Sequence, residues 1–215
     1  MSISNAVFIT GIGTDIGKTV ASCIITKALN ADYWKPIQAG NLHDSDCNTV
    51  KNLVDSPKSV FHPEKYRLTQ PLSPHAAAKI DNVDIKLSEI TIPSTSNFLV
   101  IEGAGGLMVP LNSNYTVADL IKHLNTAVIV VSKNYLGSIN HTLLTIESLK
   151  LRNIPIIGIL FNGQHTPESE NIICGLSGVK SLGRIEQTDF VDKEFIKNQA
   201  SRLKESLTNE LIRAR

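Results

Sequence analysis

The chain has 215 residues, of which 42% are hydrophobic and 19% are charged, and its formal net charge is +1. This balance is ordinary for a globular protein and gives no general electrostatic attraction to nucleic acid or to an acidic membrane surface. We therefore expect a single domain over residues 1–215 whose partner is a small molecule, with no nucleic acid or membrane partner.

The cysteines and the N-terminal segment indicate a cytoplasmic protein. The three cysteines are odd in number and lack the paired spacing of a zinc site or a redox dithiol, so reduced thiols are expected. The first residues, MSISNAVFITG, contain no basic region and too short an apolar run for a signal peptide or a membrane span. The six histidines show no metal-ligand spacing, so no histidine metal site is expected.

Six short apolar runs predict buried strands, at residues 6–10, 33–37, 98–101, 127–131, 156–161 and 179–185. Several of these runs are continuous rather than alternating, as in a parallel sheet covered on both faces. Helical patterns lie between them, clearest at residues 17–29, 116–124 and 138–151. The order predicts an α/β fold with a doubly wound, mostly parallel sheet and helices on both faces, the fold of P-loop nucleotide hydrolases.

Two further regions differ in their regularity. Residues 41–97 contain five of the prolines, so we expect helices and long loops above the sheet there. Near the C-terminus, Val191, Phe195, Leu203, Leu207 and Leu211 lie at multiples of four with charges between them. This spacing predicts an amphipathic helix that packs on the sheet.

A phosphate-binding loop is predicted at residues 11–19, GIGTDIGKT, between the first strand and the first helix. Backbone N–H groups of such a loop surround phosphate oxygens at a helix N-terminus, where the helix dipole also favours anions. Lys18 would reach the β- and γ-phosphates, and the Thr19 hydroxyl would bind Mg²⁺. Five residues rather than the common four separate Gly11 from Gly17. The alternative interpretation is a glycine-rich turn before a structural helix.

Two carboxylates are candidates for holding the metal ion. Glu102 directly follows the strand FLVI and begins the glycine-rich segment EGAGG, so it lies where parallel sheets bind ligands. A surface carboxylate at a turn is the alternative for Glu102. Asp46, in HDSDC, is a weaker candidate, because Asp44 and Asp46 are both plausible helix caps.

Polar residues also follow two other predicted strands. Lys35 lies at the end of the second run, beside the phosphate loop, where an ammonium suits an anionic substrate or the charge that develops in phosphoryl transfer. A solvated lysine is the alternative. Asn162 follows PIIGILF and could pair with an adenine, although Asn-Gly is also an ordinary turn.

These motifs together resemble dethiobiotin synthetase, a family of ATP-dependent enzymes of biotin biosynthesis. The family has the same five-residue spacing before GKT. Similar strings recur as WKPIQAG, as Asp46 in SDC, as QPLSPHAAA, as EGAGG before a Pro-Leu pair, and as LGSINHTLLT, so the resemblance spans residues 6–162. The chain departs from the family at Ile12-Gly13, at Asp15 and in the segment GRIEQTDF, where the family has a proline-rich loop.

The resemblance implies a function and a set of site residues. The family carboxylates 7,8-diaminopelargonate with CO₂ and closes a ureido ring through a carbamate and a carbamic-phosphoric anhydride, giving dethiobiotin, ADP and phosphate. ATP would be held by Gly13, Thr14, Asp15, Ile16, Gly17, Lys18, Thr19, Val20 and Asn162. Mg²⁺ would be held by Thr19, Asp46 and Glu102. Lys18, Lys35 and Thr14 would act in catalysis, and Lys35, Asn41, Gly105, Leu136, Ser138 and Asn140 would contact the diamine.

The resemblance also implies a homodimer with its active site at the interface, where residues 136–140 bind the substrate carboxylate in the neighbouring protomer's site. Three other functions remain as alternatives. A ParA/MinD-like partitioning ATPase typically has a signature lysine early in the phosphate loop, where this chain has Gly13. A P-loop amidoligase needs a glutaminase domain, for which 215 residues leave no room. The third alternative is a nucleotide-binding protein without catalytic activity.

Overall fold

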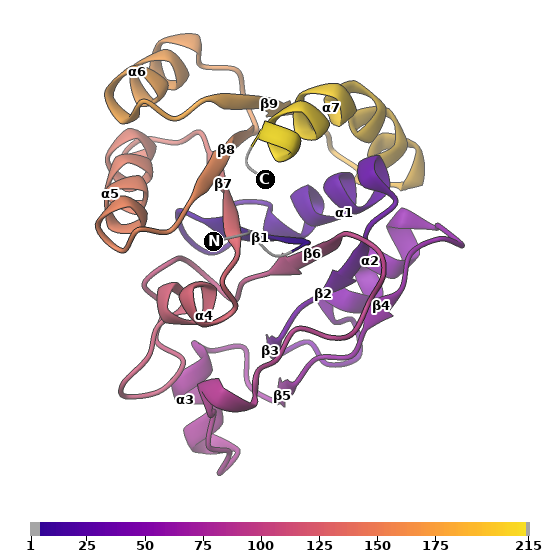
Figure 1. Ribbon diagram of the computed structural model, residues 1–215, viewed down its shortest axis with the longest axis vertical. Helices are drawn as coiled ribbons and strands as arrows, with labels where there is room; N and C mark the ends of the chain where they lie inside the picture. Colours follow the sequence, from indigo (N-terminus) through magenta and orange to yellow (C-terminus); the bar gives the residue numbers. More distant parts are fainter. Residues whose placement is uncertain (1–4, 214–215) are drawn as a thin grey trace.

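Seven parallel strands form the central sheet of the computed structural model, which describes residues 5–213 (Figure 1). Their spatial order is β4-β2-β6-β1-β7-β8-β9, and each neighbouring pair is parallel. The strands are β1 (Ala6–Gly11), β2 (Asp32–Trp34), β4 (Phe61–His62), β6 (Leu99–Glu102), β7 (Ala127–Lys133), β8 (Ile156–Asn162) and β9 (Ser181–Ile185). This confirms the predicted parallel α/β sheet.

Helices cover both faces of the sheet (Figure 1). One face packs against α1 (Lys18–Leu29), α2 (Asp46–Val54) and α7 (Lys193–Arg213), and the other against α3 (Pro74–Ile80), α4 (Val117–His123), α5 (Ser138–Leu151) and α6 (Pro167–Ser177). Alternate residues of β1 serve the two faces: Val7 and Ile9 lie in one core cluster, and Phe8 lies in the other. Both sides of the strand are therefore apolar, which is why its sequence reads as a continuous run.

The strand predicted at residues 33–37 is confirmed at its first two residues, but its bounds are wrong because two strands of different sheets share this segment. β2 ends at Trp34, and β3 (Ile37–Ala39) pairs with β5 (Tyr66–Leu68) in a separate two-stranded sheet. Pro36 lies between them and has no N–H to donate, while its carbonyl accepts from Lys65 N at 2.9 Å and Tyr66 N at 3.0 Å. The proline thus directs the chain from the main sheet into the small one.

The irregular region 41–97 contains α2, α3, β5 and a 3₁₀ helix (Leu87–Glu89), but it also supplies an edge strand to the main sheet. The expectation of helices and long loops there was wrong for the two strands β4 and β5. β4 has two residues, both half-buried, and so gives no apolar run. Helix α6, at the sequence PESENIICGLS, was also not predicted.

The predicted C-terminal amphipathic helix is confirmed as α7, which begins at Lys193, so Val191 lies before it. Leu203 and Leu207 are buried against the sheet. Gln199 occupies the same stripe, and its side chain accepts from Glu186 N at 3.2 Å and donates to Glu186 Oε2 at 3.0 Å. Among residues 5–213, no helix combines the length and apolar character needed to span a bilayer.

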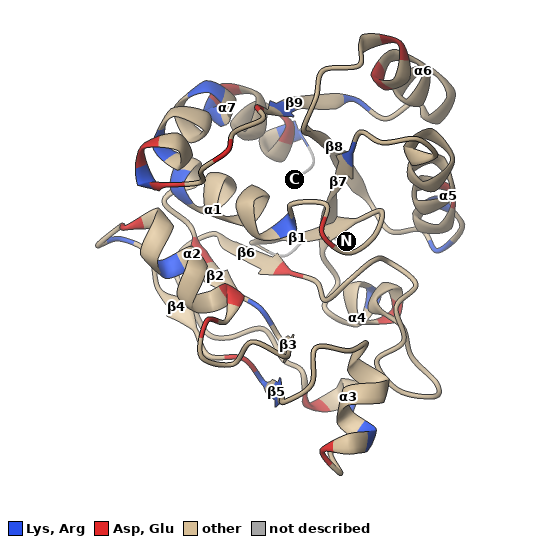
Figure 2. Ribbon diagram, turned by 180° about the vertical axis from the view of Figure 1, so that it is seen from behind, with Lys and Arg blue, Asp and Glu red and all other residues tan. Residues whose placement is uncertain are grey.

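The carboxyl ends of the strands meet at one edge of the sheet, and this edge positions the site. β1 leads into the phosphate loop, β2 into Lys35, and β6 and β8 end at Glu102 and Asn162. The strand order reverses at β1, which lies between β6 and β7, and ligands of such sheets bind at this switch point. Acidic and basic residues lie close together here, at the end of β6 and the start of α1 (Figure 2).

Candidate active site

The phosphate loop follows β1 and ends at Gly17, the N-cap residue of α1. Gly17 has φ 89°, a left-handed conformation that glycine adopts without a steric penalty. A Cβ at this position would lie 2.2 Å from Asn162 Nδ2, which donates a 2.8 Å hydrogen bond to the Ile16 carbonyl. Asn162 therefore holds the loop from the end of β8, and glycine is required where the two meet.

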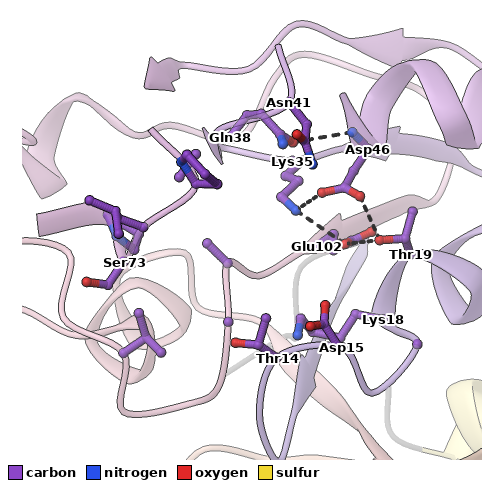
Figure 3. A pocket seen from close by; sticks show the side chains of 18 of the residues that line it. Thr14, Asp15, Lys18, Thr19, Lys35, Gln38, Asn41, Asp46, Ser73 and Glu102 are labelled. Carbon is purple, nitrogen blue, oxygen red and sulfur yellow. Dashed lines mark hydrogen bonds and ion pairs between the residues drawn. The ribbon is translucent and has the colours of Figure 1, made fainter. Parts of the chain in front are cut away.

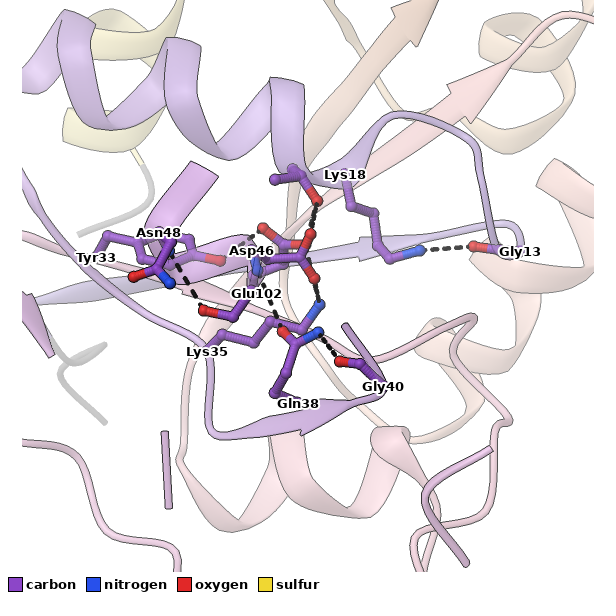
Figure 4. Close-up of polar contacts among 11 residues, drawn as sticks. Gly13, Lys18, Tyr33, Lys35, Gln38, Gly40, Asp46, Asn48 and Glu102 are labelled. Atoms are coloured by element: carbon purple, nitrogen blue, oxygen red, sulfur yellow. Dashed lines mark hydrogen bonds and ion pairs between the residues drawn. The ribbon is translucent and has the colours of Figure 1, made fainter. Parts of the chain in front are cut away.

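Lys18 is buried at the start of α1, and its ammonium points back along the loop (Figure 4). Its Nζ donates to the Gly13 carbonyl at 2.7 Å. Burial lowers the pKa of Lys18 from 10.5 to about 8, and the neighbouring Glu102 partly opposes this shift. An anion bound in the loop would offset the cost of burying this charge.

Thr19, Asp46 and Glu102 meet beside the loop (Figure 3). Thr19 Oγ1 lies 2.9 Å from both Asp46 Oδ1 and Glu102 Oε1. A hydroxyl and two carboxylates are oxygen donors of the kind that Mg²⁺ takes together with substrate phosphates and water. No group of three or more His, Cys, Asp or Glu side chains that could hold a metal occurs within the described residues. These three oxygen donors fit a magnesium ion that is bound with nucleotide phosphates.

Lys35 bridges the same two carboxylates. Its ammonium pairs with Asp46 Oδ2 and lies 3.4 Å from Glu102 Oε1. Burial opposes the charge on Lys35, but Glu102 and Asp46 outweigh it and raise the pKa of Lys35. Burial likewise opposes the charge on Asp46, and the ion pair with Lys35 outweighs it and lowers the pKa of Asp46. Lys35 and Asp46 are therefore both charged at neutral pH.

Two residues that sequence reasoning missed hold the carboxylates in place (Figure 4). Tyr33 donates its hydroxyl to Glu102 Oε2 at 2.9 Å. Gln38 accepts from the backbone N–H of Asp46 at 3.3 Å and donates to the Gly40 carbonyl at 2.9 Å. Both residues stand in the motif-bearing segment 33–40, but their contacts depend on strand register and on the small sheet, which local sequence patterns do not reveal.

One cavity of about 900 Å³ contains most of the predicted site residues. Its lining includes Thr14, Asp15, Gly17, Lys18, Thr19, Val20, Lys35, Asn41, Asp46, Glu102 and Gly105. Sequence reasoning gave no role to the residues of the wall facing the phosphate loop, which comprises Gln38, Ala39, Pro71, Leu72, Ser73 and Pro74.

The remaining predicted residues lie outside this cavity. Gly13 lines an adjoining hollow of about 440 Å³, which shares Thr14 with the cavity. Ile16 is buried in the core under the loop, and Asn162 lies against the loop's outer side. Residues 136–140 line neither space: Leu136 and Asn140 are exposed, and Ser138 is buried at the start of α5.

The chain matches known proteins over nearly its whole length. The family model described as an AAA domain matches residues 5–194. An ATP-dependent dethiobiotin synthetase BioD from Christiangramia forsetii is 52% identical over 200 residues, covering 93% of this chain and 96% of the relative. Proteins of the same name from Cytophaga hutchinsonii and Chlamydia pneumoniae are 52% and 42% identical, covering 91% and 94% of this chain and 95% and 91% of the relatives.

Solved structures support the fold at lower identity. The cell division ATPase MinD from Pyrococcus furiosus superposes with a TM-score of 0.58 at 14% identity, over 96% of this chain and 98% of that one. A ParA family ATPase from Chlorobium tepidum gives 0.55 at 14% identity, over 95% and 92%. These two likenesses show the fold alone. The identities and coverage of the sequence relatives show that this chain belongs to the ATP-dependent dethiobiotin synthetase family.

Proposed function

We propose that the chain is an ATP-dependent dethiobiotin synthetase that joins CO₂ to 7,8-diaminopelargonate and closes a ureido ring, with release of ADP and phosphate. One observation carries the proposal beyond the names of the relatives. Lys18, Lys35, Thr19, Asp46 and Glu102 line a single cavity at the carboxyl edge of the sheet. This arrangement combines a phosphate loop, oxygen donors for a metal and a second lysine, which together suit phosphoryl transfer to an anionic acceptor.

Thr19, Asp46 and Glu102 are the proposed magnesium-binding residues. A bound magnesium ion would neutralise negative charge on the phosphates of ATP. The protein's part is to hold the three oxygen donors together, which α1, α2 and β6 do from three separate elements. Two of the three oxygen donors are carboxylates, as is usual for a Mg²⁺ ion that also takes phosphate oxygens and water.

Lys18 and Lys35 both line the cavity (Figure 3) and would flank the space between the nucleotide and the diamine. Lys18 contacts the phosphates from the loop, and Lys35 faces the carbamate formed from CO₂ and one amine. The carbamate oxygen attacks the γ-phosphorus and ADP leaves, and the second amine then attacks the carbonyl carbon of the mixed anhydride, which displaces phosphate and closes the ring. Charge on the transferring group is spread over its oxygens, so the two ammonium groups and the Thr14 hydroxyl stabilise it without any protein nucleophile.

The proposed contacts to the nucleotide and to the diamine lie in and beside the cavity. Residues 13–20 surround the phosphates, and Asn162, beside the loop, contacts the base. Asn41 and Gly105, in the cavity lining, contact the diamine. A homodimer would bring Leu136, Ser138 and Asn140 of a second copy to the substrate carboxylate. The exposed apolar side chains of Tyr135, Leu136, Ile139, Leu144 and Met108 support this dimer. Two of them, Leu144 and Met108, line the hollow next to Gly13. A cytoplasmic location goes with this biosynthetic role.

The proposal is tested by ADP release from Mg-ATP and bicarbonate, with and without 7,8-diaminopelargonate, and by mass spectrometry of the product. The expected result is ADP release that depends on the diamine, with dethiobiotin formed in equal amount. Lys18→Ala should abolish turnover, whereas Lys122→Ala, an exposed lysine on α4, should not. ADP release that is indifferent to the diamine would instead indicate an ATPase with another role. Near-normal turnover by Lys18→Ala would contradict the assigned roles.

A further inference from the structure

The two oxygens of the Glu102 carboxylate have different partners. Oε1 lies 2.9 Å from the Thr19 hydroxyl and 3.4 Å from the Lys35 ammonium, on the side of the proposed metal position. Oε2 points the other way and accepts the 2.9 Å hydrogen bond from the Tyr33 hydroxyl. Glu102 is 1% exposed and Tyr33 is fully buried, so water does not compete for this hydrogen bond.

Strand pairing brings these two side chains together. Tyr33 of β2 is in register with Val100 of β6, and both lie in the core cluster under α1. Glu102 is two residues further along β6 and therefore points to the same face, roughly 6.6 Å beyond Val100. A tyrosine side chain extended along the strand spans this distance and places its hydroxyl at the carboxylate. The sheet register thus dictates the contact.

We propose that Tyr33 is a positioning residue for metal binding, which fixes the rotation of the Glu102 carboxylate so that Oε1 faces Thr19. The inference rests on the proposed function, in which Glu102 holds magnesium. Lys35 already contacts Oε1 and competes with the metal for it. A carboxylate released from Tyr33 is free to rotate toward Lys35 with both oxygens, which leaves a poorer site for the ion. Hydrogen-bond partners of metal ligands commonly contribute in this way.

Tyr33→Phe removes the hydroxyl and keeps the ring. Metal affinity is measured as the dissociation constant of Mn²⁺, a spectroscopic substitute for Mg²⁺, from the ADP complex by electron paramagnetic resonance. We expect the variant to bind Mn²⁺ about 10-fold more weakly and to recover turnover at raised metal concentration. Tyr66→Phe is the matched control: its hydroxyl accepts from Lys86 N at 3.0 Å beside the small sheet, away from the metal residues, and Mn²⁺ affinity should not change.

A double-mutant cycle with Glu102→Gln separates positioning from general loosening of the core. Glu102→Gln alone should weaken Mn²⁺ binding, and in that background Tyr33→Phe should have no further effect within a factor of about two. An additional full loss in that background, or unchanged Mn²⁺ affinity in Tyr33→Phe alone, would overturn the positioning role. Unchanged affinity in Glu102→Gln would overturn the metal assignment itself, which keeps the two failures distinct. If Tyr33→Phe does not fold, Tyr33→Met removes the hydroxyl with the same expected results.

Discussion

Exchanging Lys35 for Met removes the ammonium that lies between two carboxylates. The exposed fractions of the side chains are 9% for Lys35, 1% for Glu102 and 28% for Asp46. Breaking a buried ion pair by removing one partner costs about 3–5 kcal/mol, and hydration of the partly exposed Asp46 reduces this cost. We expect Lys35→Met to lower the free energy of unfolding of the metal-free and nucleotide-free protein by about 3 kcal/mol at pH 7.

Lys18→Met is the matched control, because it removes a second buried ammonium from the same cavity with the opposite effect on stability. The pKa of Lys18 falls from 10.5 to about 8 on burial, and at 1.36 kcal/mol per pH unit this corresponds to a cost of roughly 3 kcal/mol for keeping Lys18 charged in the folded state. Lys18→Met should therefore be as stable as the parent protein or more stable by up to about 3 kcal/mol. Both variants should lose turnover.

The two effects differ in their pH dependence. The folded pKa of Asp46 lies below its ordinary value, so its stabilisation is present above about pH 4 and is lost as the pH falls through the folded pKa. The difference in free energy of unfolding between the parent protein and Lys35→Met should therefore become smaller below about pH 4. Because the folded pKa of Lys18 is lowered to about 8, the parent protein should gain stability between pH 8 and 10, and Lys18→Met should not.

Thermal unfolding across this pH range measures these differences. For a chain of this length, a loss of about 3 kcal/mol lowers the Tm by roughly 6–12 °C. Equal destabilisation of both variants, or a deficit of Lys35→Met that stays constant down to pH 3, would refute the electrostatic reasoning.

Three further outcomes are expected. Gly17→Ala places a Cβ at φ 89° and 2.2 Å from Asn162 Nδ2, so it should destabilise the loop by about 1–3 kcal/mol and weaken ATP binding measurably in calorimetry; unchanged affinity would show that the loop tolerates the side chain. Asn162→Asp should raise the KM for ATP, because it sets a carboxylate oxygen against the Ile16 carbonyl, and the argument fails if the KM stays the same. Asp32→Asn should lower the free energy of unfolding by about 1–3 kcal/mol without changing the KM for ATP, since buried Asp32 accepts hydrogen bonds from Thr95 and Asn97 far from the cavity. Chemical denaturation measures this loss, and an unchanged free energy of unfolding would contradict the prediction.

The parts of the site that lie in continuous segments were predictable from sequence. The phosphate loop, Lys35 and Glu102 each follow an apolar run, and the carboxyl ends of parallel strands meet at one edge whatever their order. The spacing before GKT and the family motifs identified Asp46, which pattern alone could not distinguish from Asp44 as a helix cap. The predictions for the phosphate loop, Lys35 and Glu102 needed only the knowledge of where strands end.

The remaining parts depend on contacts between distant segments. The role of Tyr33 requires the register of β2 on β6, and the role of Gln38 requires the small β3–β5 sheet, whose strands have three residues each. β4 is shorter still and is a strand only because β2 lies beside it. Short segments of this kind take their conformation from tertiary pairing rather than from their own composition.

The central position of β1 has a consequence for synthesis of the chain. Val7 pairs with Val100 on one side and with Ala127 on the other, so during synthesis β1 has no neighbour in the main sheet until the residues of β6 are made. At about 5–20 residues per second, the 93 residues from Val7 to Val100 take roughly 5–19 s. During this interval the apolar residues of β1 and the phosphate loop that follows them have no sheet to pack on, so we expect the incomplete chain to expose apolar surface that promotes aggregation.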